Sequence, residues 1–244
     1  SVLEDILKFI ADELLKGIFA KAGLYGDATS MRQYADQFQT TVVPDVVATA
    51  NSDQAFGSMP VSGPNPLVIE RVIDAIPANF PVDDASYKKV MGADDSIAQA
   101  IADKRLYLTD YKALSVMIPG TFPQQKYINA SLALFAVAKG DATGALQSVA
   151  LQVGQQPAPN NPVLYPFNGE TWALGKVHVN AADGNYHELI SHLGLTHLMI
   201  EPFAVSTHAK LAVNHPVFEL LLPHIQGTLF INNAAITGLV APEG

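Results

Sequence analysis

The sequence contains no cysteine, so neither a disulfide bond nor a cysteine-based catalytic or metal site is available to it. It has no run of about 18 to 20 apolar residues, the length that a membrane-spanning helix needs. Basic side chains are scarce, with 14 Lys and Arg against 23 Asp and Glu, and they form no cluster that could neutralise nucleic-acid phosphates. We therefore expect a soluble protein, cytoplasmic or secreted or periplasmic, that does not bind nucleic acid.

Apolar side chains are plentiful, at 49% of 244 residues, which is enough for one large core or two small ones. Residues 1–50 are predicted to form amphipathic N-terminal helices, the first with an apolar face from Leu3 to Ile18. This face could cover a channel mouth or make peripheral contact with a membrane, although packing on the rest of the protein is the simpler interpretation. Residues 51–244 are expected to form the second unit.

Short apolar segments in the second unit predict a small sheet, and longer segments with few charges predict buried helices. The segment Asn51–Pro66, rich in Gly, Pro, Ser and Asn, is expected to be irregular, and so is Gln155–Pro166. The fold class predicted is mainly α with a few short strands. The expected strands are Arg105–Tyr111, Ser131–Ala138 and Leu146–Val153, and the expected long helices are Asn185–Thr207 and about His215–Leu239.

Histidines carry the strongest chemical signal, because six of the seven lie between His187 and His224 and three are spaced by five residues: His187, His192 and His197. In a regular α-helix, five residues advance about 500°, which leaves such side chains about 140° apart. A local change to i→i+5 bonding brings them to one face, and such π-distortions occur mostly at functional sites. The spacing therefore predicts a π-distorted helix.

A zinc hydrolase is an alternative, because His187-Glu188 begins the motif H-E-x-x-H. The second histidine of that motif would have to replace Ser191, and His192 comes one residue late. Buried histidines are also often plain core residues. A non-catalytic lipid-binding helical protein is the third interpretation.

The segment from His187 to Thr207, H-E-L-I-S-H-L-G-L-T-H-L-M-I-E-P-F-A-V-S-T, resembles the iron-binding helix of lipoxygenases. The segments His215–His224 and Thr228–Asn232 resemble the next helix of that family. Upstream, shorter blocks occur in the family's order. The resemblance as a whole covers about residues 51–244. The upstream blocks are Gly63–Pro66, Leu106–Tyr111, Leu151-Gln152, Pro162–Pro166, Trp172 with Lys176, and Asp183.

The resemblance implies roles for individual residues. His192 and His197 match the two iron ligands, whereas His187 and Glu188 match positions beside the metal that do not bind it. His215 and His224 match structural positions. Four residues are expected along the substrate channel: Leu193, Thr196, Ile200 and Phe203.

The sequence departs from the family pattern where Ala209 and Ile236 replace two arginines. The family completes its iron shell from a helical second half, with a further histidine, an Asn, Ser or His, and the C-terminal carboxylate. Because two ligands hold a catalytic iron poorly, we expect the chain to be a fragment that needs its C-terminal remainder for activity.

The implied function is that of a non-haem iron dioxygenase of the bacterial type, acting on linoleate- or arachidonate-like fatty acids. A hydrogen atom is taken from the methylene between two cis double bonds, and O2 adds to the resulting pentadienyl radical to give a lipid hydroperoxide. The cofactor expected is iron, as Fe2+ or Fe3+, and the substrates expected are a polyunsaturated fatty acid and O2.

Overall fold

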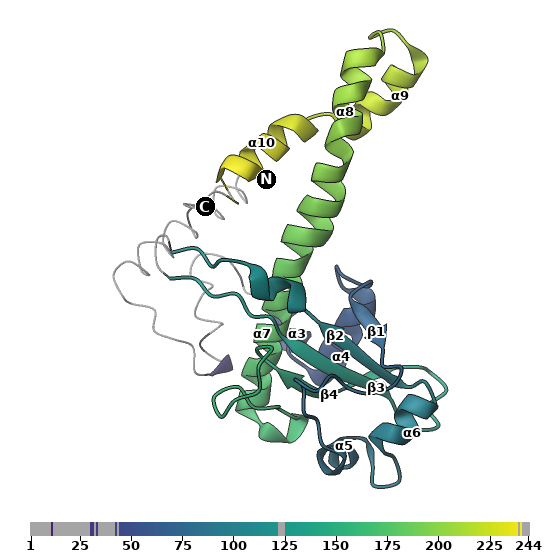
Figure 1. Ribbon diagram of the computed structural model, residues 1–244, viewed down its shortest axis with the longest axis vertical. Coiled ribbons are helices and arrows are strands. Elements are labelled where there is room, and N and C mark those ends of the chain that lie inside the picture. The colour runs from purple at the N-terminus through teal and green to yellow at the C-terminus, as the bar shows by residue number, and fades with distance from the viewer. Residues whose placement is uncertain are drawn as a thin grey trace.

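The computed structural model describes residues 44–121, 125–238 and 240, together with positions 11, 30, 31, 33 and 42. Most of the predicted unit 1–50, including all but one residue of its first helix, lies outside the described residues. Within them, a body built around a small sheet carries one long helical rod, and two further helices pack at the far end of the rod (Figure 1). The rod consists of α7 (Glu170–Tyr186), a π-helix (His187–Leu198) and α8 (Met199–Lys210).

The elements follow one another with the sheet first and the long helices last. They are α3 (Val47–Ala50), α4 (Asp53–Ser62), β1 (Ile69–Arg71), α5 (Asp84–Met91), α6 (Ile97–Ala102), β2 (Leu106–Asp110), a 3-10 turn (Lys112–Val116), β3 (Leu132–Val137), β4 (Leu146–Gln152), a 3-10 turn (Pro166–Asn168), α7 (Glu170–Tyr186), the π-helix (His187–Leu198), α8 (Met199–Lys210), α9 (Pro216–Ile225) and α10 (Thr228–Gly238).

The described strands form one antiparallel sheet in the order β1-β2-β3-β4. Leu108 pairs with Leu134, and Leu134 pairs with Ala150, with a register shift between Leu134 and Phe135. The three strands expected from the sequence are confirmed to within a residue or two at their ends. The short strand β1 was not predicted, since three residues give too little alternation to be recognised.

The central strands are buried on both faces, so alternate residues of β3 enter two different cores. Ala133 and Phe135 join one cluster with the rod's Trp172 and Val179. Leu132, Leu134 and Ala136 join the other cluster, which α5 and α6 cover. The helix α7 is therefore fixed on one face of the sheet, and this fixes the direction of the rod.

The expectation that Asn51–Pro66 is irregular is wrong, because Asp53–Ser62 forms α4. Ser52 caps the helix, accepting from the amide of Ala55 at 3.1 Å. Phe56 is buried against the rings of Phe135 and Trp172, with ring centroids 5.5 and 6.0 Å away. Tertiary burial of one aromatic side chain outweighs the poor local helix propensity of this Gly- and Pro-containing segment.

Two predicted helix boundaries also need correction. The rod begins at Glu170 rather than at Asn185, and it continues without a break to Lys210. The helix predicted over His215–Leu239 is two helices, α9 and α10, separated at Gln226-Gly227. Gly227 has a φ of +81°, a left-handed conformation that stops α9 and lets α10 turn back toward the rod.

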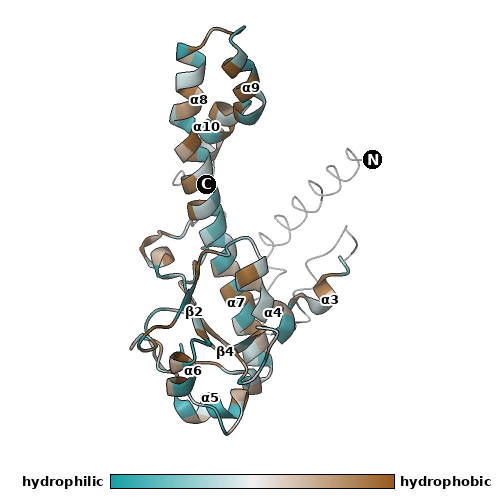
Figure 2. Cartoon of the chain, turned by 90° about the vertical axis from the view of Figure 1, so that its right-hand side faces the viewer, coloured by the Kyte–Doolittle hydropathy of each residue, from teal (hydrophilic) through white to brown (hydrophobic). Residues whose placement is uncertain are grey.

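The helices α8, α9 and α10 expose many large apolar side chains. Figure 2 shows apolar residues on all three, at the end of the molecule distant from the sheet. The most exposed include Met199 at 61%, Phe203 at 63%, Leu220 at 67% and Phe230 at 78%. Exposed apolar side chains gathered in this way typically mark an interaction surface. None of the described helices combines the length and the apolar character needed to cross a bilayer.

Candidate metal centre

A buried polar cluster fixes the rod just before the histidine segment. Asp183, on α7, is 4% exposed, and its Oδ1 accepts from the hydroxyl of Tyr111 at 2.8 Å and from Nδ2 of Asn65 at 3.0 Å. Asn65 Nδ2 also donates to the carbonyl oxygen of Asp183 at 2.7 Å. Burial raises the pKa of Tyr111 and the Asp183 carboxylate raises it further, so the phenol stays a donor. The sequence blocks carrying Asn65, Tyr111 and Asp183 thus meet in space.

A second cluster fixes the beginning of the rod. Lys176 is 3% exposed, and its Nζ donates to Asp53 Oδ1 at 2.7 Å. Trp172 Nε1 donates to the same oxygen at 2.8 Å. Lys176 also donates to the backbone oxygen of Asn51. These contacts tie α7 to the start of α4, so the rod is held by the sheet, by α4 and by Tyr111.

The π-distortion predicted from the histidine spacing is confirmed, because residues His187–Leu198 form a π-helix between α7 and α8. Its wider turn places the three histidines in a row. The rings of His187 and His192 stack with centroids 5.6 Å apart, and those of His192 and His197 meet edge to face at 4.8 Å. Residues five apart, which a regular helix would separate, are therefore neighbours.

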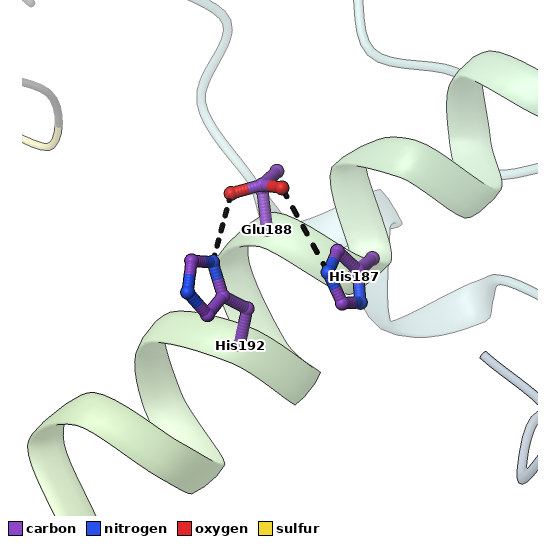
Figure 3. A group of neighbouring side chains, drawn as sticks. All are labelled: His187, Glu188 and His192. Carbon is purple, nitrogen blue, oxygen red and sulfur yellow. Dashed lines mark hydrogen bonds and ion pairs between the residues drawn. The ribbon is translucent and has the colours of Figure 1, made fainter. Parts of the chain in front are cut away.

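Glu188 orients the middle histidine, as Figure 3 shows. Its Oε2 lies 3.0 Å from Nδ1 of His192. A carboxylate oxygen accepts, so Nδ1 of a neutral His192 carries the hydrogen and Nε2 keeps a free electron pair. A metal-binding histidine typically makes this kind of outer contact through its second nitrogen.

His197 is held in the same manner, but by a different helix. Its Nδ1 lies 3.0 Å from the amide oxygen Oδ1 of Asn232 on α10. An amide oxygen also accepts, so Nε2 of His197 is again the nitrogen with a free electron pair. His192 and His197 therefore have adjacent rings, each with Nδ1 engaged and Nε2 available.

His187 differs from the other two histidines. Its Nδ1 is buried and finds no hydrogen-bond partner within the described part of the chain, and its Nε2 lies 3.8 Å from Glu188 Oε1. Ligand atoms of His187, Glu188 and His192 lie within 4.8 Å of one another, so this trio could also hold a metal ion. A metal ion bound by this trio would take up the Glu188 oxygens that lie beside the two rings. Binding through Nδ1 of His192 would also require that nitrogen to lose its hydrogen.

Three further histidines have different surroundings. His215 caps α9, accepting from the amide of Val217 at 3.1 Å. His178 lies with Nδ1 2.8 Å from Nδ2 of Asn129, and burial lowers its pKa. His224, which was expected to be structural, lines a hollow beside His197.

This hollow, of about 410 Å³, is formed by the π-helix, α8, α9 and α10. Three of the four residues expected along a substrate channel line it, namely Thr196, Ile200 and Phe203, whereas Leu193 does not. Leu195 and Met199 also line it and were not predicted. Their apolar side chains carry no signal in the sequence that separates a channel wall from a core.

Comparisons with known proteins agree with this class of site. A family model described as "Lipoxygenase" matches residues 21–244. The chain is 38% identical over 253 residues to a linoleate 9/13-lipoxygenase of Pseudomonas aeruginosa, covering all of this chain and 35% of that protein. Among solved structures, a calcium-dependent 11R-lipoxygenase matches with a TM-score of 0.76 at 31% identity, covering 91% of this chain and 33% of the solved one.

A further solved lipoxygenase, described as an anaerobic complex with arachidonate, matches with a TM-score of 0.75 at 30% identity over 97% of this chain and 36% of its own. A helical domain with a histidine-bearing π-helix is the class that the fold and the site define. The chain belongs to the lipoxygenase family. It spans about a third of the length of the relatives named here.

Proposed function

We propose that this chain supplies part of the catalytic domain of an iron-dependent dioxygenase that inserts O2 into polyunsaturated fatty acids. The observation that carries the proposal is the pair of adjacent imidazoles, His192 and His197, each with Nδ1 engaged and Nε2 free. Neutral imidazole nitrogen is a suitable ligand for iron. The residues therefore fit the metal as two of its ligands, and the iron, when bound, supplies the redox chemistry that removes a hydrogen atom.

The substrate proposed has a 1,4-cis,cis-pentadiene, as in linoleic or arachidonic acid. The apolar hollow beside His197 supports this substrate class, because its lining by Leu195, Ile200 and Phe203 suits an acyl chain and its volume is within the usual range of about 300 to 1,000 Å³. Leu193 is retained as a channel residue on the family resemblance alone. The described residues of the chain offer two such imidazoles, so we propose that the C-terminal remainder of the polypeptide supplies the other ligands.

The same remainder is the partner proposed for the exposed apolar surface of α8, α9 and α10. Its large apolar side chains, Phe203, Leu220 and Phe230 among them, are each more than 60% exposed. Apolar side chains exposed to this extent are typical of an interaction surface. A helical segment packed on these three helices would bury them and would close the hollow at the same time. The domain division at residue 50 remains a prediction.

Metal analysis of the complete polypeptide that contains this chain tests the metal centre. Iron, manganese and zinc are measured in the wild type and in the variants His187→Gln, His192→Gln and His197→Gln, with His208→Gln as a surface control on α8. The proposal expects iron in the wild type, in His187→Gln and in the control, and its loss in the other two variants. Zinc that depends on residues 187 and 192 but not on residue 197 would instead support the hydrolase alternative.

Activity is tested with linoleic and arachidonic acids under O2. A conjugated-diene product with near-ultraviolet absorbance is expected from the wild type and from the His187→Gln variant. The dioxygenase would be refuted if the wild type contains no metal and makes no such product. If the wild type and the His197→Gln variant then also bind fatty acid with equal affinity, a non-catalytic lipid-binding protein is favoured. The family relationship gives no support to a hydrolase.

A further inference from the structure

Asn232 is the least expected member of the centre, since it lies 35 residues after His197 and on another helix. It is 1% exposed, so its amide must find protein partners. It has three: Nδ1 of His197 at 3.0 Å, the backbone oxygen of His197 at 3.0 Å, and Oε2 of Glu201 at 2.7 Å. One side chain therefore contacts both the ring and the backbone of one histidine.

These partners determine which way the amide faces. The carbonyl oxygen of His197 and the carboxylate of Glu201 are both acceptors, so both must face the NH2 group of Asn232. The amide oxygen is left to face Nδ1 of His197, and an oxygen there requires a hydrogen on that nitrogen. A reversed amide would place its oxygen against two acceptors, the His197 carbonyl oxygen and the Glu201 carboxylate, and both would lose their donor.

We infer that Asn232, oriented by Glu201, is a positioning residue that fixes His197 in the tautomer whose Nε2 binds the metal. This inference rests on the proposed function and adds a link between metal binding and the packing of α10 on the rod. Asn232 is not among the residues that line the hollow, and it acts through His197. His192 obtains the same tautomer from Glu188, a neighbour on its own helix. The two rings are thus set independently, one locally and one by a long-range contact.

A hydrophobic replacement tests the link. The Asn232→Leu variant keeps a side chain of similar size but removes the acceptor for His197 Nδ1, so both tautomers of the ring become accessible. Loss of such outer contacts typically weakens metal binding by about 10- to 100-fold. Fe2+ alone is titrated into the metal-free, complete polypeptide by calorimetry under anaerobic conditions, and a loss of affinity in that range is expected. Asn233→Leu, at an exposed neighbouring position on α10, is the matched control and keeps wild-type affinity.

Variants at Glu201 separate orientation from packing. Glu201→Gln still offers an oxygen to the NH2 group of Asn232, so it is expected to keep wild-type Fe2+ affinity. Glu201→Leu cannot, and its affinity is expected to fall, although by less than in the Asn232→Leu variant because the His197 backbone oxygen still holds the amide. Thermal unfolding of each metal-free protein reports damage to the fold on its own.

Two failures are distinguishable. If the wild type binds no Fe2+, the proposed function fails. If the wild type binds Fe2+ and Asn232→Leu binds it equally well, the function stands and the positioning role is refuted. A lower unfolding temperature of the metal-free Asn232→Leu protein, with unchanged affinity below that temperature, also refutes it, because Asn232 would then only be packing α10.

Discussion

Replacement of Tyr111 by Phe tests whether the buried Asp183 cluster holds the rod. Tyr111 is fully buried and donates to Asp183 Oδ1 at 2.8 Å, so the variant removes one hydrogen bond from a buried carboxylate. The ring and its contact with Tyr186, at a centroid distance of 6.0 Å, remain in place. Asn65 is left as the side-chain donor to that oxygen.

The expected loss follows from the charge of the acceptor. A hydrogen bond to a charged group contributes about 1.5 to 3 kcal/mol, and no carbon is removed, so no cavity adds to this figure. We expect the free energy of unfolding to fall by about 2 kcal/mol, near the middle of that range. The matched control is Tyr107→Phe, on β2 shortly before Tyr111, whose exposed hydroxyl donates to the Lys104 carbonyl at 3.2 Å. A change within about 0.5 kcal/mol is expected there.

Urea denaturation measures both variants, and a lower midpoint with an unchanged slope indicates a pure loss of stability. The single variant Asp183→Asn and the double variant complete a cycle, in which contacting partners are expected to show a coupling energy of about 0.5 to 3 kcal/mol. If Tyr111→Phe is as stable as Tyr107→Phe, or if the cycle shows no coupling, the Tyr111–Asp183 bond does not hold the rod.

Two further predictions concern acid stability and the hollow. Arg105 donates two hydrogen bonds to the buried Asp95, at 2.8 and 2.9 Å, and these lower the pKa of that carboxyl. The resulting stability is present above the unfolded pKa of about 3.9 and is lost as the pH falls through the lower folded pKa. The Arg105→Met variant is therefore less stable than the wild type at pH 7, and the difference shrinks on acidification. A difference that is equal at all pH values, or equal to that of the control Lys88→Met at an exposed side chain, would contradict this. Ile200→Trp is expected to narrow the hollow and to raise KM for arachidonic acid with unchanged iron content. Val205→Trp, on α8 outside the hollow, is expected to leave KM unchanged. Equal KM values for the two variants would show that the substrate does not enter the hollow.

The sequence was most informative where a feature depends on a local pattern in the chain. Short apolar segments predicted β2, β3 and β4, because a strand buried on both faces is a short, nearly continuous apolar run. The five-residue spacing of His187, His192 and His197 predicted the π-helix, because only a wider turn places those side chains on one face. Both predictions depend on geometry within one element, which the sequence contains in full.

Features that depend on contacts between distant segments were missed or misplaced. The helix α4 forms in a segment with poor local propensity because Phe56 is buried against Phe135 and Trp172, far along the chain. The break between α9 and α10 depends on the backbone angle of Gly227, and glycine alone does not show which angle it adopts. The family blocks around Asn65 and Asp183 are weak motifs singly, and their shared role appears only when the fold brings them together.

Asn232 shows why the support of the proposed ligand pair could not be predicted from the sequence, although the pair itself was. In both histidines the nitrogen proposed to bind the metal is determined by the group that Nδ1 faces. For His192 that group is close in the sequence, and for His197 it is distant. Glu188 is four residues from His192 on the same helix, and its position beside the centre was predicted from the family resemblance. Asn232 reaches His197 only because α9 stops at Gly227 and α10 folds back on the rod. A substitution that changes this turn should therefore weaken the metal site through His197 while leaving the Glu188–His192 contact intact.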